Sequence, residues 1–163
     1  MNLFPSRHLL AVSIALVVLG PAVAPHCDQP SGSLGASGSA SSPAGKWKTI
    51  DEKTGKVKSI VAIREQDGQL YGTIETLFDP PVPHPTCYLC SGAKKDMPLV
   101  GLQVLWGFHL DGSQWSGGQV LDPETGRIYR ASLALEDGGK KLRLHGYIGI
   151  PPLGRTQYWT RTE

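Results

Sequence analysis

Tight-turn sequences recur along the chain from residue 51 to residue 139, and they constrain the fold more than any other feature. Each is rich in aspartate or glycine, which tolerate the backbone angles that hairpin turns require. Between the turns, apolar and polar side chains alternate, which is the period of a strand that buries one face. The pattern predicts an antiparallel all-β protein. The turns are Asp51–Gly55, Asp67–Gly68, Asp111–Gly112, Asp122–Gly126 and Asp137–Gly139.

The segments between the turns predict about eight strands, because each is long enough to cross a small sheet. The cleanest alternation lies in residues 141–150, where Leu142, Leu144, Ile148 and Ile150 are expected on one apolar face. The predicted strands span residues 45–50, 57–65, 70–77, 99–110, 118–121, 127–135, 141–150 and 155–161.

Residues 99–110 form a long apolar run. Gly101 and Gly107 argue against a helix there and favour a strand that is kinked at the glycines. Strand alternation would place the even positions on one face. Those positions are Val100, Leu102, Val104, Trp106, Phe108 and Leu110.

An open sheet of about eight strands would leave two unpaired edges and an uncovered apolar face. Closing the sheet into a barrel removes both problems, so we predict a small antiparallel meander barrel. A two-sheet sandwich is the alternative. An eight-stranded barrel has an interior that side chains can fill or that can hold one small ligand.

Gly45-Lys46-Trp47 opens the first predicted strand, and Arg155 and Arg161 lie in the last. These two strands resemble the first and last strands of lipocalins. Lipocalins begin with a Gly-x-Trp whose indole packs at the closed end of the barrel, often beneath an arginine of the final strand. The resemblance implies a lipocalin-like barrel in which an arginine stacks on Trp47.

Residues 1–24 have the pattern of an export signal. Arg7 supplies a basic start, residues 9–19 are an apolar core too short to span a bilayer comfortably, and Ala22-Val23-Ala24 matches a cleavage site. Pro25 disfavours a cut directly before it, so cleavage further along or retention as an anchor are the alternatives. After cleavage no membrane span is expected. Residues 25–44 are predicted to be a flexible linker and residues 45–163 the barrel domain.

The charge of the chain is nearly balanced, at a formal +2. A nucleic-acid-binding protein would need a basic face with interleaved aromatic side chains, and the sequence shows none, so no nucleic-acid partner is expected. The glycine-containing segments join strand to strand and never open a helix, which argues against a phosphate-binding loop. No catalytic residue and no cofactor is predicted.

The longest irregular segment, residues 78–98, is rich in proline and holds Cys87 and Cys90. Export favours a structural disulfide between these two cysteines. A redox-active pair is a second interpretation, although the strand–helix setting typical of such pairs is absent. A metal site formed by His84, Cys87 and Cys90 is a third, with Cys27 or His109 as the fourth ligand.

Aromatic side chains and one arginine are candidates for a small ligand pocket. Packing in the barrel core is the simpler interpretation for each aromatic residue, including Phe108 and Trp159. His145 falls on a polar face beside Arg143 and is expected to be solvated. The candidate ligand-binding residues are Tyr71, Trp106, Tyr129, Tyr147, Arg155 and Tyr158.

Short motifs are spread in order over nearly the whole predicted domain. They are Gly45-x-Trp47, Thr54-Gly55-Lys56, Leu70-Tyr71-Gly72-x-Ile74, Cys87-x-x-Cys90-x-Gly92, Pro98-Leu99-x-Gly101, Trp115-x-Gly117-Gly118, Leu121-Asp122-Pro123-x-x-Gly126-x-x-Tyr129, Gly146-Tyr147-Ile148-Gly149 and Gly154-Arg155-Thr156-Gln157-x-Trp159. Together they resemble the DUF2147 family of exported bacterial proteins. The resemblance implies a periplasmic or secreted β-barrel with a cysteine pair in one loop. It implies no activity.

Three functions fit the sequence. The first is a module that binds a small apolar or amphipathic molecule in the barrel mouth, beside the cysteine-containing loop. The second is a structural or protein-interaction module that uses residues 78–98 as its contact surface. The third is a redox protein centred on Cys87 and Cys90.

Overall fold

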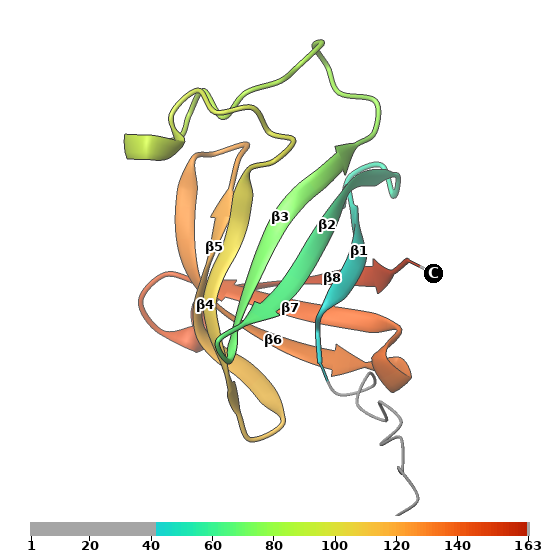
Figure 1. The fold of residues 1–163 in the computed structure, drawn as a ribbon, viewed down its shortest axis with the longest axis vertical. Coiled ribbons are helices and arrows are strands. Elements are labelled where there is room, and N and C mark those ends of the chain that lie inside the picture. The colour runs from blue at the N-terminus through green and yellow to red at the C-terminus, as the bar shows by residue number, and fades with distance from the viewer. Residues whose placement is uncertain (1–41, 163) are drawn as a thin grey trace, which may run out of the picture. The chain divides into compact units, whose positions relative to one another are not determined.

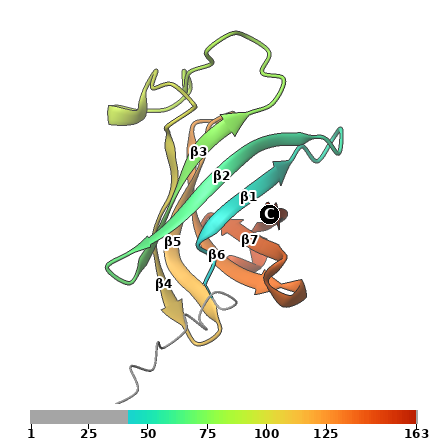
Figure 2. The ribbon, with the colours of Figure 1, turned by 45° about the vertical axis from the view of Figure 1, so that its right-hand side comes forward.

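A computed structural model of the chain describes residues 42–162 (Figure 1). Eight antiparallel strands form a closed barrel in which each strand pairs with its neighbours in sequence and β1 pairs with β8 (Figure 2). The predicted meander barrel is confirmed. The strands are β1 (Gly45–Ile50), β2 (Val57–Gln66), β3 (Gln69–Leu77), β4 (Gln103–Asp111), β5 (Gln114–Asp122), β6 (Arg127–Glu136), β7 (Lys141–Tyr147) and β8 (Arg155–Arg161), and three short 3-10 turns are η1 (Gly92–Lys94), η2 (Asp137–Gly139) and η3 (Pro151–Leu153). The predictions for residues 1–41 lie outside the described residues.

The β1–β8 seam turns the sheet into a barrel. Trp47 pairs with Arg161 across this seam, and the Thr162 N–H donates to the Lys46 carbonyl at 2.8 Å. Neither β1 nor β8 is therefore a free sheet edge, and the sandwich alternative is wrong.

Two bulges in β4 change which side chains face the interior. Leu70 pairs with Phe108, Gly72 with Leu105 and Thr73 with Gln103, so β4 contains two residues more than the matching part of β3. Inward positions in this region therefore recur every three residues, and Leu102, Leu105 and Phe108 are fully buried. The predicted even-numbered face of residues 99–110 is only partly present: Leu102, Val104 and Phe108 are buried, but Leu105 is buried as well. Val100 and Leu110 at its two ends are more than half exposed.

β7 is shorter than predicted. It ends at Tyr147, and Ile148 and Ile150 are 62 % and 59 % exposed instead of facing the core. Gly149 has a φ of +79°, and the prolines that open η3 cannot donate ladder hydrogen bonds, so strand pairing stops here.

Large side chains fill the barrel interior. Two glycines make room for them: a Cβ on Gly72 would lie 2.8 Å from Leu105, and one on Gly118 would overlap the Phe108 ring. Tight packing of this kind leaves the interior little freedom to change volume. The buried residues on the strands include Trp47, Val61, Ile63, Leu70, Ile74, Leu105, Phe108, Trp115, Ala131, Leu133, Leu142, Leu144 and Trp159.

Trp47 and Arg161 seal one end of the barrel, as the lipocalin resemblance implied. The Arg161 guanidinium lies 4.3 Å from the centre of the Trp47 ring, and burial lowers the pKa of Arg161. Arg161 Nη1 donates to the Ala44 carbonyl, and Trp47 Nε1 donates to the Pro43 carbonyl, both at 2.8 Å. Residues 42–44, placed in the predicted linker, are thus held against the barrel.

Candidate functional site

The connections β1–β2, β3–β4, β5–β6 and β7–β8 lie at the barrel end opposite Trp47, because consecutive hairpins alternate between the two ends. We call these ends the loop end and the Trp47 end. At the Trp47 end the connections are short turns. At the loop end, the β3–β4 connection spans residues 78–102 and rises above the tips of β4 and β5 (Figure 1).

The disulfide Cys87–Cys90 organises the β3–β4 connection. Both cysteines are buried, and the Cys90 N–H donates to the Cys87 carbonyl at 3.1 Å. Strand-like bonds close the base of the connection, where Thr86 pairs with Pro98. The structure thus has the disulfide that export favoured. Among residues 42–162, no group of three His, Cys, Asp or Glu side chains is arranged to hold a metal ion.

The disulfide-bonded part of the connection packs on the outer wall of the barrel. The Leu89 carbonyl lies so close to Gly126, in the β5–β6 turn, that a Cβ there would overlap it. Lys94 Nζ lies 4.9 Å from the centre of the Trp106 ring and donates to the Gln103 carbonyl at 2.7 Å, and burial lowers the pKa of Lys94. This segment therefore rests on β4 and the β5–β6 turn.

Replacing Cys87 and Cys90 together by serine is expected to lower the free energy of unfolding by about 2 kcal/mol or less, because the disulfide closes only a short ring. Urea unfolding followed by Trp fluorescence measures this loss. Thiol titration under mild reductant provides the companion measurement, and cycling thiols at positions 87 and 90 would contradict the structural role of the disulfide.

The six candidate ligand-binding residues do not lie together. Tyr129 and Arg155 occupy inward positions at the loop end. The Tyr129 Cβ would be 3.6 Å from a Cβ on Gly146, and Arg155 forms an ion pair with Glu52 of the β1–β2 connection. The hydrogen bond and charge of Glu52 raise the pKa of Arg155.

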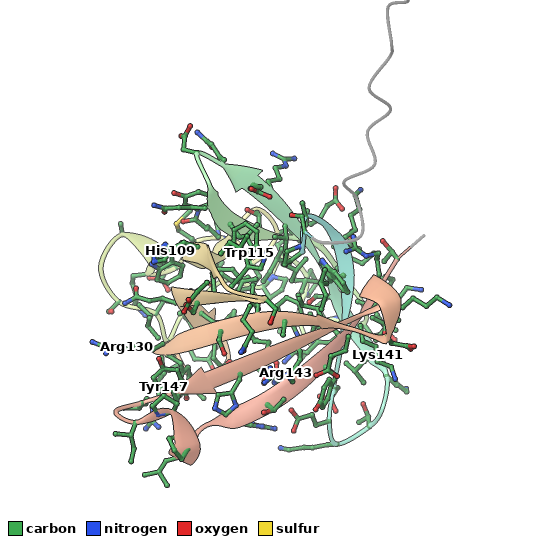
Figure 3. The ribbon with its side chains drawn as sticks, turned by 90° about the horizontal axis from the view of Figure 1, so that it is seen from below. His109, Trp115, Arg130, Lys141, Arg143 and Tyr147 are labelled. Carbon is green, nitrogen blue, oxygen red and sulfur yellow. A yellow bond between two sulfur atoms is a disulfide. The ribbon has the colours of Figure 1, made fainter. Side chains whose placement is uncertain are left out.

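The other four candidates lie on the outer wall. Tyr71, Tyr147 and Tyr158 alternate with inward residues, and Trp106 lies between the inward Leu105 and Phe108 of the bulged strand. The Tyr71 hydroxyl donates to Gln69 Oε1 at 3.0 Å, and Trp106 Nε1 donates to Gln119 Oε1 at 2.8 Å. Tyr158 is 52 % exposed. Tyr147 lies beside Arg130 on the outer face of β6 and β7 (Figure 3).

His145 has a structural role that the sequence did not indicate. Its Nδ1 lies 2.8 Å from the Thr156 hydroxyl, and its Nε2 lies 2.8 Å from the Pro151 carbonyl. A Cβ on Gly154 would lie 2.5 Å from His145 Nε2, so the imidazole fits tightly beneath the β7–β8 connection. His145 therefore holds that connection in place, and its partly exposed imidazole has two protein hydrogen-bond partners that the expectation of a solvated side chain did not include.

Exposed apolar side chains gather at the loop end. Twelve large apolar residues are exposed in the described chain, and all but Leu110 and Tyr158 lie in or directly beside the β3–β4, β5–β6 and β7–β8 connections. Sequence patterning missed part of this group because Ile148 and Ile150 continue the apolar alternation of β7. The ten residues are Phe78, Val82, Tyr88, Leu89, Met97, Val100, Ile128, Ile148, Ile150 and Leu153.

A shallow hollow of about 250 Å³ lies on the outer wall of β2 and β3. Val100 and Gly101 border it, because the Gly101 N–H donates to the Ile74 carbonyl at 2.8 Å and holds this segment beside β3. The hollow is open to solvent, and none of the six candidate ligand-binding residues lines it. It is lined by Ala62, Arg64, Thr73, Ile74, Glu75, Val100 and Gly101.

Comparisons with known proteins agree with this geometry. Protein HP1028 from the human pathogen Helicobacter pylori, described as belonging to the lipocalin family, has a similar fold with a TM-score of 0.65. The two sequences are 20 % identical, and the match covers 75 % of this chain and 84 % of that one. No curated protein matches the sequence. Among the described residues, no helix is both long and apolar enough to cross a membrane.

A family model described as an uncharacterized protein conserved in bacteria, DUF2147, matches residues 45–161, which is the whole barrel from the start of β1 to the end of β8. The chain therefore belongs to the DUF2147 family and has a lipocalin-like barrel.

Proposed function

We propose that this chain is an exported bacterial binding protein that takes up a small apolar or amphipathic molecule at the loop end of its barrel. The observation that carries the proposal is the gathering of exposed apolar side chains at this end. Large exposed apolar patches on soluble proteins mark binding sites more often than chance.

The barrel interior supports the same location. Trp47, Phe108 and Trp159 fill the space toward the Trp47 end, so a ligand would sit near the loop end. There the inward positions of β6, β7 and β8 include Tyr129, Gly146 and Arg155, and a Cβ on Gly146 would have only ordinary contacts, at 3.6 Å, with Val120 and Tyr129. Arg155 at the rim supplies a charged group for the polar end of an amphipathic ligand.

The disulfide supports export, because such bonds persist outside the reducing cytoplasm. The signal-like pattern of residues 1–24 agrees with it. Periplasmic or secreted location is therefore part of the proposal.

Binding of the soluble probe N-phenyl-1-naphthylamine tests the proposal. We expect the probe fluorescence to rise on titration, and we expect Gly146→Leu to weaken binding at least tenfold because the larger side chain would project between Val120 and Tyr129 into the proposed site. Tyr129→Ser, which removes the ring without adding bulk, is expected to weaken binding less. Tyr71→Ala on the outer wall is the control and should bind as the unaltered chain does. Unchanged binding in both Gly146→Leu and Tyr129→Ser, or no binding at all, would contradict the proposal.

A further inference from the structure

Six of the exposed apolar residues form what we call the apolar strip. Leu89 lies against Gly126, which joins the β3–β4 connection to the β5–β6 turn. The pairing of Arg130 with Tyr147 brings the start of β6 beside the end of β7, so the strip continues into the β7–β8 connection. In Figure 1 the η1 part of the β3–β4 connection projects at the upper left of the barrel and the β7–β8 connection projects at the left, lower down. The strip consists of Tyr88, Leu89, Ile128, Ile148, Ile150 and Leu153, which are 46–77 % exposed.

The backbone beneath the strip is held in place before any partner arrives. The disulfide fixes the segment around Tyr88 and Leu89. In η3, the Leu153 N–H donates to the Ile150 carbonyl at 3.2 Å, and His145 holds the Pro151 carbonyl. Little of the backbone would therefore become ordered on docking, so the loss of conformational entropy would be small.

Cationic side chains flank the strip. Lys94 and Lys95 follow the disulfide, and the exposed Arg127 and Arg130 lie on either side of Ile128 in β6. Within residues 42–162, Arg127 and Arg130 form no ion pair with a carboxylate, and Lys94 is held by the Gln103 carbonyl and the Trp106 ring.

Carboxylates offset only part of this positive charge. Asp96 forms an ion pair with Lys95 at 3.4 Å, and Asp122 lies opposite Arg127 in the β5–β6 ladder. Glu124 of the β5–β6 turn pairs with Lys58. A partner that is apolar at its centre and anionic around it would complement both features of the strip.

We propose that the apolar strip docks on the surface of a lipid bilayer that contains anionic lipids. The apolar side chains would enter the boundary between headgroups and acyl chains, and the flanking cations would contact lipid phosphates. The strip consists of separate side chains on two connections and on β6, and a fluid surface accommodates such projections without a matching shape. This inference rests on the proposed function, since the bilayer would be the place where an apolar ligand is taken up or delivered.

Cosedimentation of the full chain with sucrose-loaded vesicles tests the inference. Vesicles of phosphatidylethanolamine with phosphatidylglycerol are compared with vesicles of phosphatidylcholine alone. Ile150→Asp is matched with Leu110→Asp, because these side chains are 59 % and 60 % exposed and only Ile150 lies in the strip. We expect Ile150→Asp to weaken binding to the anionic vesicles at least tenfold and Leu110→Asp to change it less than twofold. Arg127→Glu with Arg130→Glu should remove most of the preference for anionic vesicles.

Several results would overturn the inference. One is no binding to anionic vesicles. Another is equal binding by the two aspartate variants, as would occur if residues 1–24 alone bound the vesicles. A third is a dimer in solution that dissociates in Ile150→Asp, because the strip would then be covered by a second copy. If the unaltered chain binds N-phenyl-1-naphthylamine but not the anionic vesicles, docking alone is rejected. If it binds the vesicles but not the probe, the ligand site alone is rejected.

Discussion

Replacing Trp47 by alanine is expected to lower the free energy of unfolding by about 3–5 kcal/mol. Trp47 is fully buried, so its removal leaves a large cavity at the sealed end of the barrel. The Arg161 guanidinium loses the ring on which it stacks, and the Pro43 carbonyl loses its indole donor. Trp47 also pairs across the β1–β8 seam, so its replacement weakens the contact that closes the barrel.

Urea unfolding followed by far-UV circular dichroism measures the Trp47→Ala effect. Tyr158→Ala is the control, since Tyr158 lies on the outer wall of the neighbouring strand and is 52 % exposed. Its effect should stay within about 0.5–1 kcal/mol. A loss below about 1.5 kcal/mol for Trp47→Ala would show that the seal contributes far less than its burial implies.

Replacing Gly126 by alanine is expected to destabilise the protein by about 2–4 kcal/mol and to separate the cysteine-containing segment from the barrel. Gly126 has a φ of +68°, which costs a non-glycine residue about 1–2 kcal/mol. The new Cβ would also overlap the Leu89 backbone, and a backbone cannot move aside as a flexible side chain can. Amide hydrogen exchange should therefore become faster around Cys87 and Leu89 than elsewhere.

Gly112→Ala is a closely matched control for this experiment. Gly112 lies in the β4–β5 turn with a φ of +62°, and a Cβ there would meet nothing within 4 Å. This variant carries the backbone cost without the overlap, so the difference between the two variants measures the contact between the turn and Leu89. Equal losses, with unchanged exchange around Cys87, would mean that the segment does not depend on the β5–β6 turn.

The alternation of side chains and the turn sequences were enough to predict the barrel. Each hairpin is a local feature, and closure follows from the need to cover the edges of a sheet this long. The Gly-x-Trp pattern predicted that a tryptophan and an arginine would seal one end of the barrel. It did not show whether that arginine would be Arg155 or Arg161. These two arginines have the same inward parity in β8 but lie at opposite ends of the strand, and only Arg161 reaches Trp47.

The β4 bulges could not be predicted from alternation, because a bulge is placed by packing against the neighbouring strands. Leu105 faces inward because Gly72 leaves space for it, a relation between residues far apart in the sequence. The position of the cysteine-containing segment similarly depends on Gly126. The separation of the candidate ligand-binding residues could be predicted in part, because alternation places Tyr71 on the other face of its strand from Leu70 and Ile74.

The β1–β8 seam also sets an order for biosynthesis. Arg161 bonds to Ala44 across a separation of 117 residues, so this contact cannot form until the last strand has been made. Until then, β1 and β7 each present an unpaired edge that can pair with another chain. Bringing such distant segments together is slow, so the nascent protein depends on protection from aggregation up to the moment when its final strand arrives.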